Sequence, residues 1–342
     1  MMKIWLVFVI VMVVSVKAEE MDHNKDAHKA LCRVLREVVG AYQSGSGSEV
    51  LRKALKKTIF GNETGGDLET LKGLPSDYED VLRDVDSRSF ACGQPRNHWE
   101  EYKSVYQPRW SGHSAPHDLV CLCTVGHKGW PLNGTTPEKE KEKLCGKTED
   151  ALGGNKEGWD SIEHGKGKAQ IKATWENVTS DCFLGGGKGE TLKDALKEFT
   201  GKLVPQPITG QENRKQLGEG KPDETYACTG SKTYGVCVMY YPTFTAHTWW
   251  VDLQKAIQED EKIQEQKKRD EEKEKRREQE DAEKQDAQKT ETLKSTLTTT
   301  NQTDQQHRND TLHEKLRKLN LTSGTPIILP SSWLLRAVFL LI

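Results

Sequence analysis

Eight cysteines lie between Cys32 and Cys237, and the rest of the chain has none. In an oxidising compartment, an even number of cysteines predicts disulfides rather than free thiols, and the connectivity stays open. Cys121 and Cys123 are too close in the chain to bond each other, so they are expected to tie their segment to two different places. The cysteines expected to bond are Cys32, Cys92, Cys121, Cys123, Cys145, Cys182, Cys228 and Cys237.

The N-terminus has the features of a signal peptide. Lys3 precedes an apolar run over residues 4–16, and Val16-Lys17-Ala18 has small or modest residues where a signal peptidase cleaves. A membrane helix is the alternative, but the apolar run is too short to span a bilayer. Residues 1–18 are therefore expected to be removed.

The C-terminus has the order of residues that is typical of a GPI-anchor signal. Three small residues, Ser323, Gly324 and Thr325, precede a spacer at 326–332 and an apolar end at 333–342. We expect attachment at Ser323, with Gly324 as the near alternative, and removal of residues 324–342. A membrane helix needs ~20 apolar residues, about twice what this end offers. The two signals together predict a lipid-anchored protein on the outer leaflet of the plasma membrane.

The overall composition excludes one class of partner and adds candidate modification sites. The net charge is −2 with 30% charged residues, so no strong basic field exists to attract nucleic acid. Asn-x-Ser/Thr triplets are acceptors for N-glycans in secreted proteins. The candidates are Asn62, Asn133, Asn177, Asn301, Asn309 and Asn320.

The fold class is predicted to be mainly α: an elongated helical-bundle domain with disulfide-held loops over residues 19–258. Apolar residues three and four apart predict helices at 22–42 and 48–60. Weaker patterns predict further helices at 77–85, 97–106, 139–150, 167–182 and 191–203, and a single good strand candidate at 235–241. The Gly- and Pro-rich segments 90–137 and 205–222 are expected to be irregular surface loops.

Residues 259–323 are predicted to be a charged stalk, helical or extended, followed by a flexible linker. Trp249 and Trp250 begin a segment that is expected to pack on the domain. After Ile263 acidic and basic residues alternate at a spacing that supports a solvated helix, as in the pair Glu265 and Arg269. No continuous apolar seam follows, so a coiled coil is not expected, and a disordered charged spacer is the alternative.

No catalytic residue, cofactor site or metal site is predicted. The one group that suggests a metal is His113, His117, Cys121, Cys123 and His127, but Cys-x-Cys lacks the spacing of structural zinc sites and secreted thiols oxidise. The glycine-rich segment 185–189 lacks the first glycine and the Ser/Thr of a phosphate-binding loop. Nucleophile motifs are missing as well, so an enzyme is not expected.

These features together resemble a known family. The signal peptide, the domain opening with Ala30-Leu31-Cys32, the charged linker and the ending Ser323-Gly324-Thr325-Pro326 followed by Ser331-Ser332-Trp333-Leu334-Leu335-Arg336 closely resemble African trypanosome variant surface glycoproteins. The tail is most similar to the Trypanosoma congolense type, with a B-class N-terminal domain. Many members carry a second cysteine-rich domain before the anchor, and here the charged stalk takes its place.

The resemblance implies a surface coat glycoprotein that shields the parasite membrane and supports immune evasion by antigenic variation. It implies a domain built on a long antiparallel helix pair, homo-oligomers, and host antibodies as partners. Segments 90–137 and 205–222 are the expected antigenic surface. The alternative is a related GPI-anchored receptor for a host macromolecule, of the transferrin or haptoglobin–haemoglobin sort.

Overall fold

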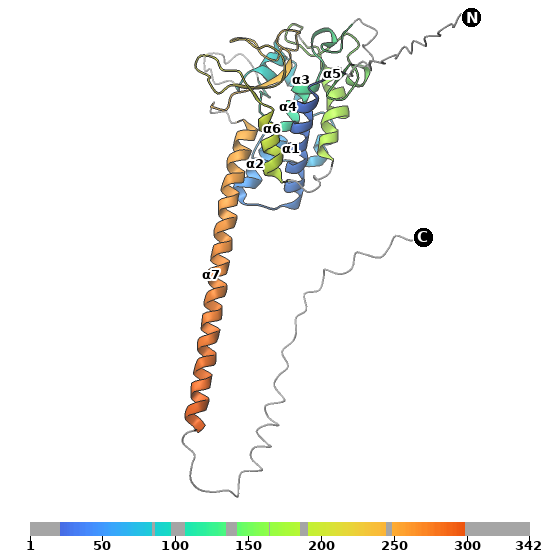
Figure 1. The fold of residues 1–342 in the computed structure, drawn as a ribbon. Helices are drawn as coiled ribbons and strands as arrows, with labels where there is room; N and C mark the ends of the chain where they lie inside the picture. The colour runs from blue at the N-terminus through green and yellow to red at the C-terminus, as the bar shows by residue number, and fades with distance from the viewer. Residues whose placement is uncertain are drawn as a thin grey trace, which may run out of the picture. The chain divides into compact units, whose positions relative to one another are not determined.

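The structure is a computed structural model that describes residues 21–83, 86–96, 107–134, 142–163, 165–184, 191–243 and 248–297, the last ten by their backbone alone (Figure 1). The chain divides into a unit that ends at Lys268 and a second unit that begins at Arg269. Several predictions lie outside the described residues: the signal peptide, the helix at 97–106, the linker beyond residue 297 and the anchor signal. The sequons at Asn301, Asn309 and Asn320 lie outside them too.

Two helices near the N-terminus form an antiparallel hairpin. Helix α1 spans Lys25–Ser44 and helix α2 spans Glu49–Phe60, close to both predictions. Gly45 ends α1 with φ 63°, a left-handed conformation that favours glycine. Ser48 caps α2 by accepting a hydrogen bond from the Leu51 backbone N–H at 3.4 Å. The short connection therefore follows from the local sequence.

Helix α6, Leu192–Gly201, lies antiparallel to α1. Arg33 of α1 pairs with Glu198, and Asp26, about two turns earlier on α1, pairs with Lys202 at 3.4 Å just past the end of α6. The earlier residue on α1 thus pairs with the later residue of the α6 segment, which is the arrangement of antiparallel helices. Phe199 of α6 is fully buried, so this face of the helix contributes to the core.

The first turns of α7, Trp249–Leu297, complete a four-helix arrangement within the first unit. The contacts that fix its direction are Lys57 with Asp252, Ser48 with Asp260 and Lys193 with Glu261. From Lys57 of α2 back to Ser48 at its start, the partners advance from Asp252 to Asp260 on α7. On α6, Phe199 lies beside Trp249 and the earlier Lys193 pairs with the later Glu261. Helix α7 is therefore antiparallel to α2 and to α6. It consequently runs in the same direction as α1. The long antiparallel helix pair that the resemblance implied is not formed by the two longest described helices.

Helix α4, Ala115–Cys123, lies in the middle of the domain and corrects the prediction of an irregular segment at 90–137. All of its residues are buried, and it contacts α1, α2, α5 and β5. Ser114 caps its N-terminus and Pro116 lies in its first turn. Because protein surrounds this helix, its sequence has no polar face, and the helical period cannot be recognised.

The remaining helical segments are short. Helix α3 spans Tyr78–Val81, and helix α5 spans Lys168–Thr174 and continues through a π turn at Trp175–Thr179 and a 3₁₀ turn at Ser180–Phe183. The helix predicted for 167–182 is thus helical throughout, in three geometries. Other single turns lie at Leu68–Lys72, Ser89–Gly93, His127–Gly129 and Asp150–Leu152.

Two small sheets lie beside the helices. Strand β1, Asp22–His23, pairs in parallel with β2, Lys143–Leu144, so the prediction of a helix at 139–150 is wrong for the described residues 142–150. Leu144 is the one buried apolar residue there before the disulfide at Cys145, which leaves too little apolar surface for a helix face. The second sheet is antiparallel and comprises β3, Val204–Pro205, β4, Lys215–Glu219, and β5, Val236–Tyr240.

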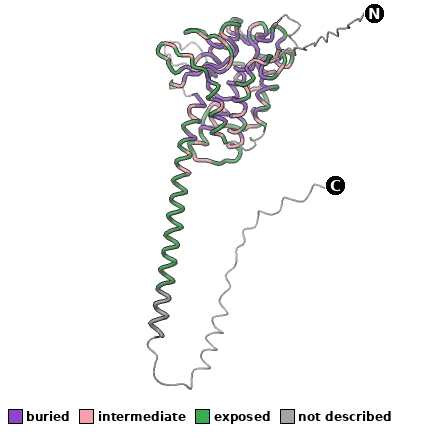
Figure 2. Tube along the Cα trace, in the orientation of Figure 1, coloured by how far each residue is buried: buried purple, intermediate pink, exposed green. Residues whose placement is uncertain are grey.

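The core of the first unit lies where α1, α4, β5 and the start of α7 meet (Figure 2). All five residues of β5 are buried, which explains why this strand was the only one visible in the sequence. Strand β4 was predicted to be a loop because it contains only one large apolar residue, the fully buried Leu217. The prediction of a mainly α fold with disulfide-held loops is confirmed.

In the second unit the described chain is the continuation of α7. Residues Arg269 to Ala287 are all exposed (Figure 2). The helix ends at Leu297. The charged stalk is therefore helical over its described part, and the alternative of a disordered spacer is wrong there.

Candidate functional site

All eight cysteines form disulfides. The pairs are Cys32–Cys182, Cys92–Cys121, Cys123–Cys145 and Cys228–Cys237. Cys121 and Cys123, both on α4, thus tie this central helix to two different segments. The bond from α1 to Cys182 closes a sequence separation of 150 residues and constrains the unfolded chain most in the loop-entropy account.

The histidines of the suspected metal cluster have other partners. The Nδ1 of His117 lies 3.0 Å from the Tyr78 hydroxyl, and its Nε2 lies 2.9 Å from the Ala91 carbonyl oxygen. Burial lowers the pKa of His117 to about 3, so its imidazole is neutral. His127 pairs with Asp160 at 2.6 Å. With Cys121 and Cys123 in disulfides, these residues do not form a metal site.

Asp118 of α4 is a buried carboxylate that connects three elements. It accepts hydrogen bonds from the Gly112 backbone N–H at 3.0 Å, from the Tyr240 hydroxyl at 2.9 Å and from the Trp249 indole N–H at 2.6 Å. Burial raises the pKa of Asp118 to about 7, against the lowering effect of these three donors. The contacts attach β5 and the first residue of α7 to the central helix.

Arg88 is fully buried, and it forms no ion pair with a carboxylate of the described residues. Its guanidinium donates to the carbonyl oxygens of Val125, Trp159, Cys121 and Thr124 at 3.3, 2.7, 2.9 and 2.9 Å. Burial lowers the pKa of Arg88 to about 9. Sequence reasoning missed this residue, because one arginine in a polar segment carries no periodic signal. It holds the chain after α4 in place.

Three of the six sequons lie in the described chain, and all three asparagines are exposed. Asn62 accepts hydrogen bonds from the Thr64 hydroxyl at 2.6 Å and from the Gly65 backbone N–H at 2.8 Å. Asn177 instead donates through Nδ2 to the Ala151 carbonyl oxygen at 2.8 Å. Asn133 follows the buried Leu132. Each position is open to solvent, as an attached glycan requires.

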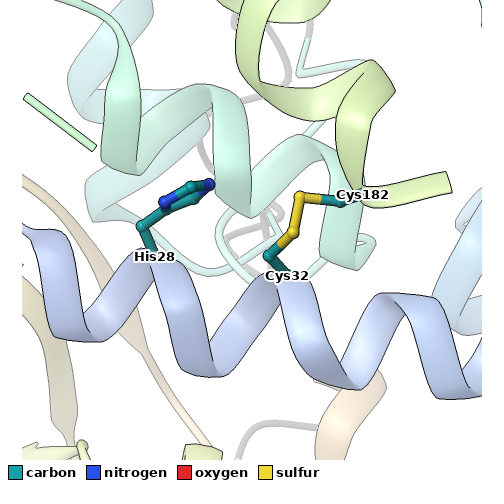
Figure 3. A group of neighbouring side chains, drawn as sticks. All are labelled: His28, Cys32 and Cys182. Atoms are coloured by element: carbon teal, nitrogen blue, oxygen red, sulfur yellow. A yellow bond between two sulfur atoms is a disulfide. The ribbon is translucent and has the colours of Figure 1, made fainter. Parts of the chain in front are cut away.

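One other group of possible ligand atoms exists among the described residues (Figure 3). His28 and Cys32 lie one turn apart on α1, and the side chain of His28 lies beside the disulfide from Cys32 to Cys182. The imidazole nitrogen and the two sulfurs lie within 4.8 Å of one another. Burial lowers the pKa of His28 to about 4. The sequence spacing of His28 and Cys32 was visible, but nothing in the sequence paired Cys32 with Cys182.

None of the helices in the described chain has an apolar stretch long enough to cross a bilayer.

The fold and its residues define a helical, disulfide-linked domain whose buried polar groups serve structure and which continues into a charged helix. The family model of the trypanosomal VSG domain matches residues 36–259, more than half of the chain. The protein therefore belongs to the trypanosomal VSG family, which is a family of trypanosome surface coat proteins. A search of curated proteins finds no relative that matches this chain.

Proposed function

We propose that this protein is a GPI-anchored coat glycoprotein that shields the parasite membrane and takes part in immune evasion by antigenic variation. The observation that carries the proposal is the match of the VSG domain over residues 36–259. The small residues at Ser323 and Gly324, followed by an apolar end, support the anchor. A lipid anchor with two acyl chains holds a protein stably on a membrane, whereas one chain holds it marginally.

The internal architecture suits a shield whose surface varies. Four disulfides and the buried contacts of Arg88 and Asp118 fix the fold from inside, so exposed side chains are free to change. The exposed charges of α7 and glycans at the sequons keep such a coat hydrated. No step of this role requires catalysis, and we propose that the protein is not an enzyme.

The structure exposes only part of the segments expected to be antigenic. Within 90–137, residues 109–126 are almost entirely buried, so this part of the segment cannot be presented to antibodies. Within 205–222, Gln216 and Leu217 of β4 are buried as well. We propose that host antibodies bind segments 61–70, 205–213 and 219–226, none of which contains a buried residue. Homo-oligomers on the cell surface are part of this proposal.

Phospholipase treatment tests the anchor. Phosphatidylinositol-specific phospholipase C should release the mature protein from cells, and its C-terminal peptide should end at Ser323 or Gly324 with the glycolipid remnant. The matched control is a variant with two arginines introduced into residues 333–342, which should remain unanchored. Finding residues 333–342 in the purified mature protein by mass spectrometry would contradict the proposal.

A further inference from the structure

The disulfide Cys32–Cys182 differs from the other three in its exposure. Cys32 is 6% exposed, and the other seven cysteines are 0 or 1% exposed. Cys32 also lies in the wall of a groove of about 570 Å³ along α1, together with His28, Lys29 and Arg36. Cys145, of the Cys123–Cys145 disulfide, lines the same groove but is only 1% exposed. A reductant of low molecular weight therefore reaches this bond before the others, since thiol–disulfide exchange requires access to a sulfur atom.

His28 supplies a nitrogen with no hydrogen-bond partner beside this bond. Its Nε2 is buried and unsatisfied among the described residues, although buried polar atoms usually have a partner. A histidine also lies beside a second disulfide, because the Nε2 of His117 is 3.7 Å from the sulfur of Cys121. Both nitrogens of His117 already have partners, and Cys121 is 0% exposed. Of these two histidine–disulfide pairs, the one at His28 therefore has an imidazole nitrogen without a hydrogen-bond partner, and the one at His117 does not.

We propose that reduction of Cys32–Cys182 turns this group into a Zn²⁺ site formed by His28, Cys32 and Cys182. A thiol reductant donates two electrons and two protons, the sulfur–sulfur bond breaks into two thiols, and the reductant leaves as its own disulfide. Zn²⁺ then displaces the two thiol protons and binds both thiolates and the Nε2 of His28. Water from the groove takes the fourth position, as in zinc sites with three protein ligands.

The geometry needs only small side-chain movements. With Zn–S near 2.3 Å and Zn–N near 2.0 Å, ligand atoms of a tetrahedral site lie about 3.3 to 3.8 Å apart. The nitrogen and the two sulfurs already lie within 4.8 Å of one another. The sulfurs must separate from their bonded distance of 2.04 Å, and rotation about the two Cα–Cβ bonds allows that without moving α1. The site is closed to zinc in the oxidised protein and opens in a thiol-rich environment.

The experiment uses the full mature protein. Dithiothreitol is added in steps, removed by anaerobic gel filtration and followed by alkylation and peptide mass spectrometry. Cys32 and Cys182 should be labelled first, while Cys123 and Cys145, whose disulfide borders the same groove, stay bonded. A parallel sample receives ZnCl₂, is filtered again and is analysed for metal. One zinc per chain should be retained, and it should protect Cys32 and Cys182 from alkylation.

Matched variants separate ligation from charge. His28→Gln should lower zinc affinity at least about tenfold, the scale seen when groups around a zinc site are altered. Lys29→Gln changes the charge of the same groove without removing a ligand and should bind zinc like the natural protein. Cobalt in place of zinc should give a thiolate charge-transfer absorption that the Cys32→Ser variant loses.

Several results would overturn the proposal. They are equal zinc retention by the oxidised and reduced proteins, unchanged affinity in His28→Gln, and first labelling at another disulfide. Loss of the circular dichroism of the folded domain when only Cys32–Cys182 is reduced would also overturn it, because the ligands would then no longer be held together.

Discussion

Asp118 and Arg88 are charged groups held inside the domain by different arrangements. The Asp118 carboxylate accepts hydrogen bonds from a backbone N–H, a tyrosine hydroxyl and a tryptophan indole N–H. The Arg88 guanidinium donates hydrogen bonds to four backbone carbonyl oxygens. A buried charge is costly unless hydrogen bonds compensate it. Removal of either side chain leaves buried polar groups without hydrogen-bond partners, so substitutions at Asp118 and Arg88 should change the free energy of unfolding measurably.

Asp118 should make the stability of the domain depend on pH. Its folded pKa is about 7, above the ordinary value of 3.8, so the folded state binds the proton more tightly than the unfolded state. Above pH 7 the ionised Asp118 therefore lowers the free energy of unfolding relative to the protonated form. This loss disappears as the pH falls from 7 toward 4, because the folded state then binds the proton. When the pH is lowered from 8 to 5, the unfolding free energy of the natural protein should rise relative to that of the Asp118→Asn variant, which has no carboxylate to protonate. Urea unfolding at each pH measures it, and a pH-independent difference would contradict the assignment.

Arg88→Ala should destabilise the domain by more than about 3 kcal/mol, because several buried carbonyl oxygens lose their donor at about 1–3 kcal/mol each. Arg88→Lys keeps the charge but loses the planar guanidinium, so its free energy of unfolding should lie between those of Arg88→Ala and the natural protein. Chemical denaturation measures both. Equal stability of Arg88→Ala and the natural protein would show that water replaces the guanidinium.

At the scale of elements, the sequence predicted the helices that have one polar face. The α1, α2 and α6 helices carry apolar residues at helical spacing, and Ser48 and Thr191 mark two of their starts. Helix α4 escaped prediction because it is buried on all sides and contains His117 and Asp118. Strand β2 escaped because its position is fixed by partners far away in the chain, Asp22 and the disulfide to Cys123. Likewise, the partners of Arg88, Asp118 and His28 are set by tertiary contacts that no local pattern reveals.

Trp249 fastens the start of α7 to the domain. It is fully buried, packs 5.3 Å from the Phe199 ring and donates its indole N–H to Asp118. Trp249→Ala should cost about 3–5 kcal/mol of unfolding free energy, the range for a large buried aromatic side chain. Glu274→Ala, at an exposed position of the same helix, should change it by less than about 0.5 kcal/mol. Thermal unfolding of the two variants makes the comparison, and similar losses would contradict it.

The boundary between packed and solvated helix should appear in limited proteolysis. Buried residues on α7 end at Ile257, and side chains from Glu265 to Ala287 are exposed. Trypsin has many sites between Lys267 and Lys289 and should release a resistant fragment ending near Ile263. Deletion of residues 265–288 should leave the melting temperature nearly unchanged, because no buried apolar area is lost. Resistance of that region, together with a melting temperature lowered by several degrees, would mean that it packs against a partner.

At the scale of the whole molecule, the resemblance to variant surface glycoproteins implied a coat protein, and the family match over residues 36–259 supports that role. Shielding is a collective property. A single copy covers too little of the membrane to shield it, so the proposed coat requires very many copies at the cell surface. A receptor for a host macromolecule, by contrast, works at low copy number.

The copy number on expressing cells therefore tests the central claim most directly. Surface proteins of living parasites should be biotinylated, captured and quantified by gel densitometry and by mass spectrometry against a known amount of labelled peptide. The proposed coat function predicts that this protein is among the most abundant species in the captured fraction. A minor band, in cells whose surface is dominated by another protein, would contradict the coat function and favour a receptor.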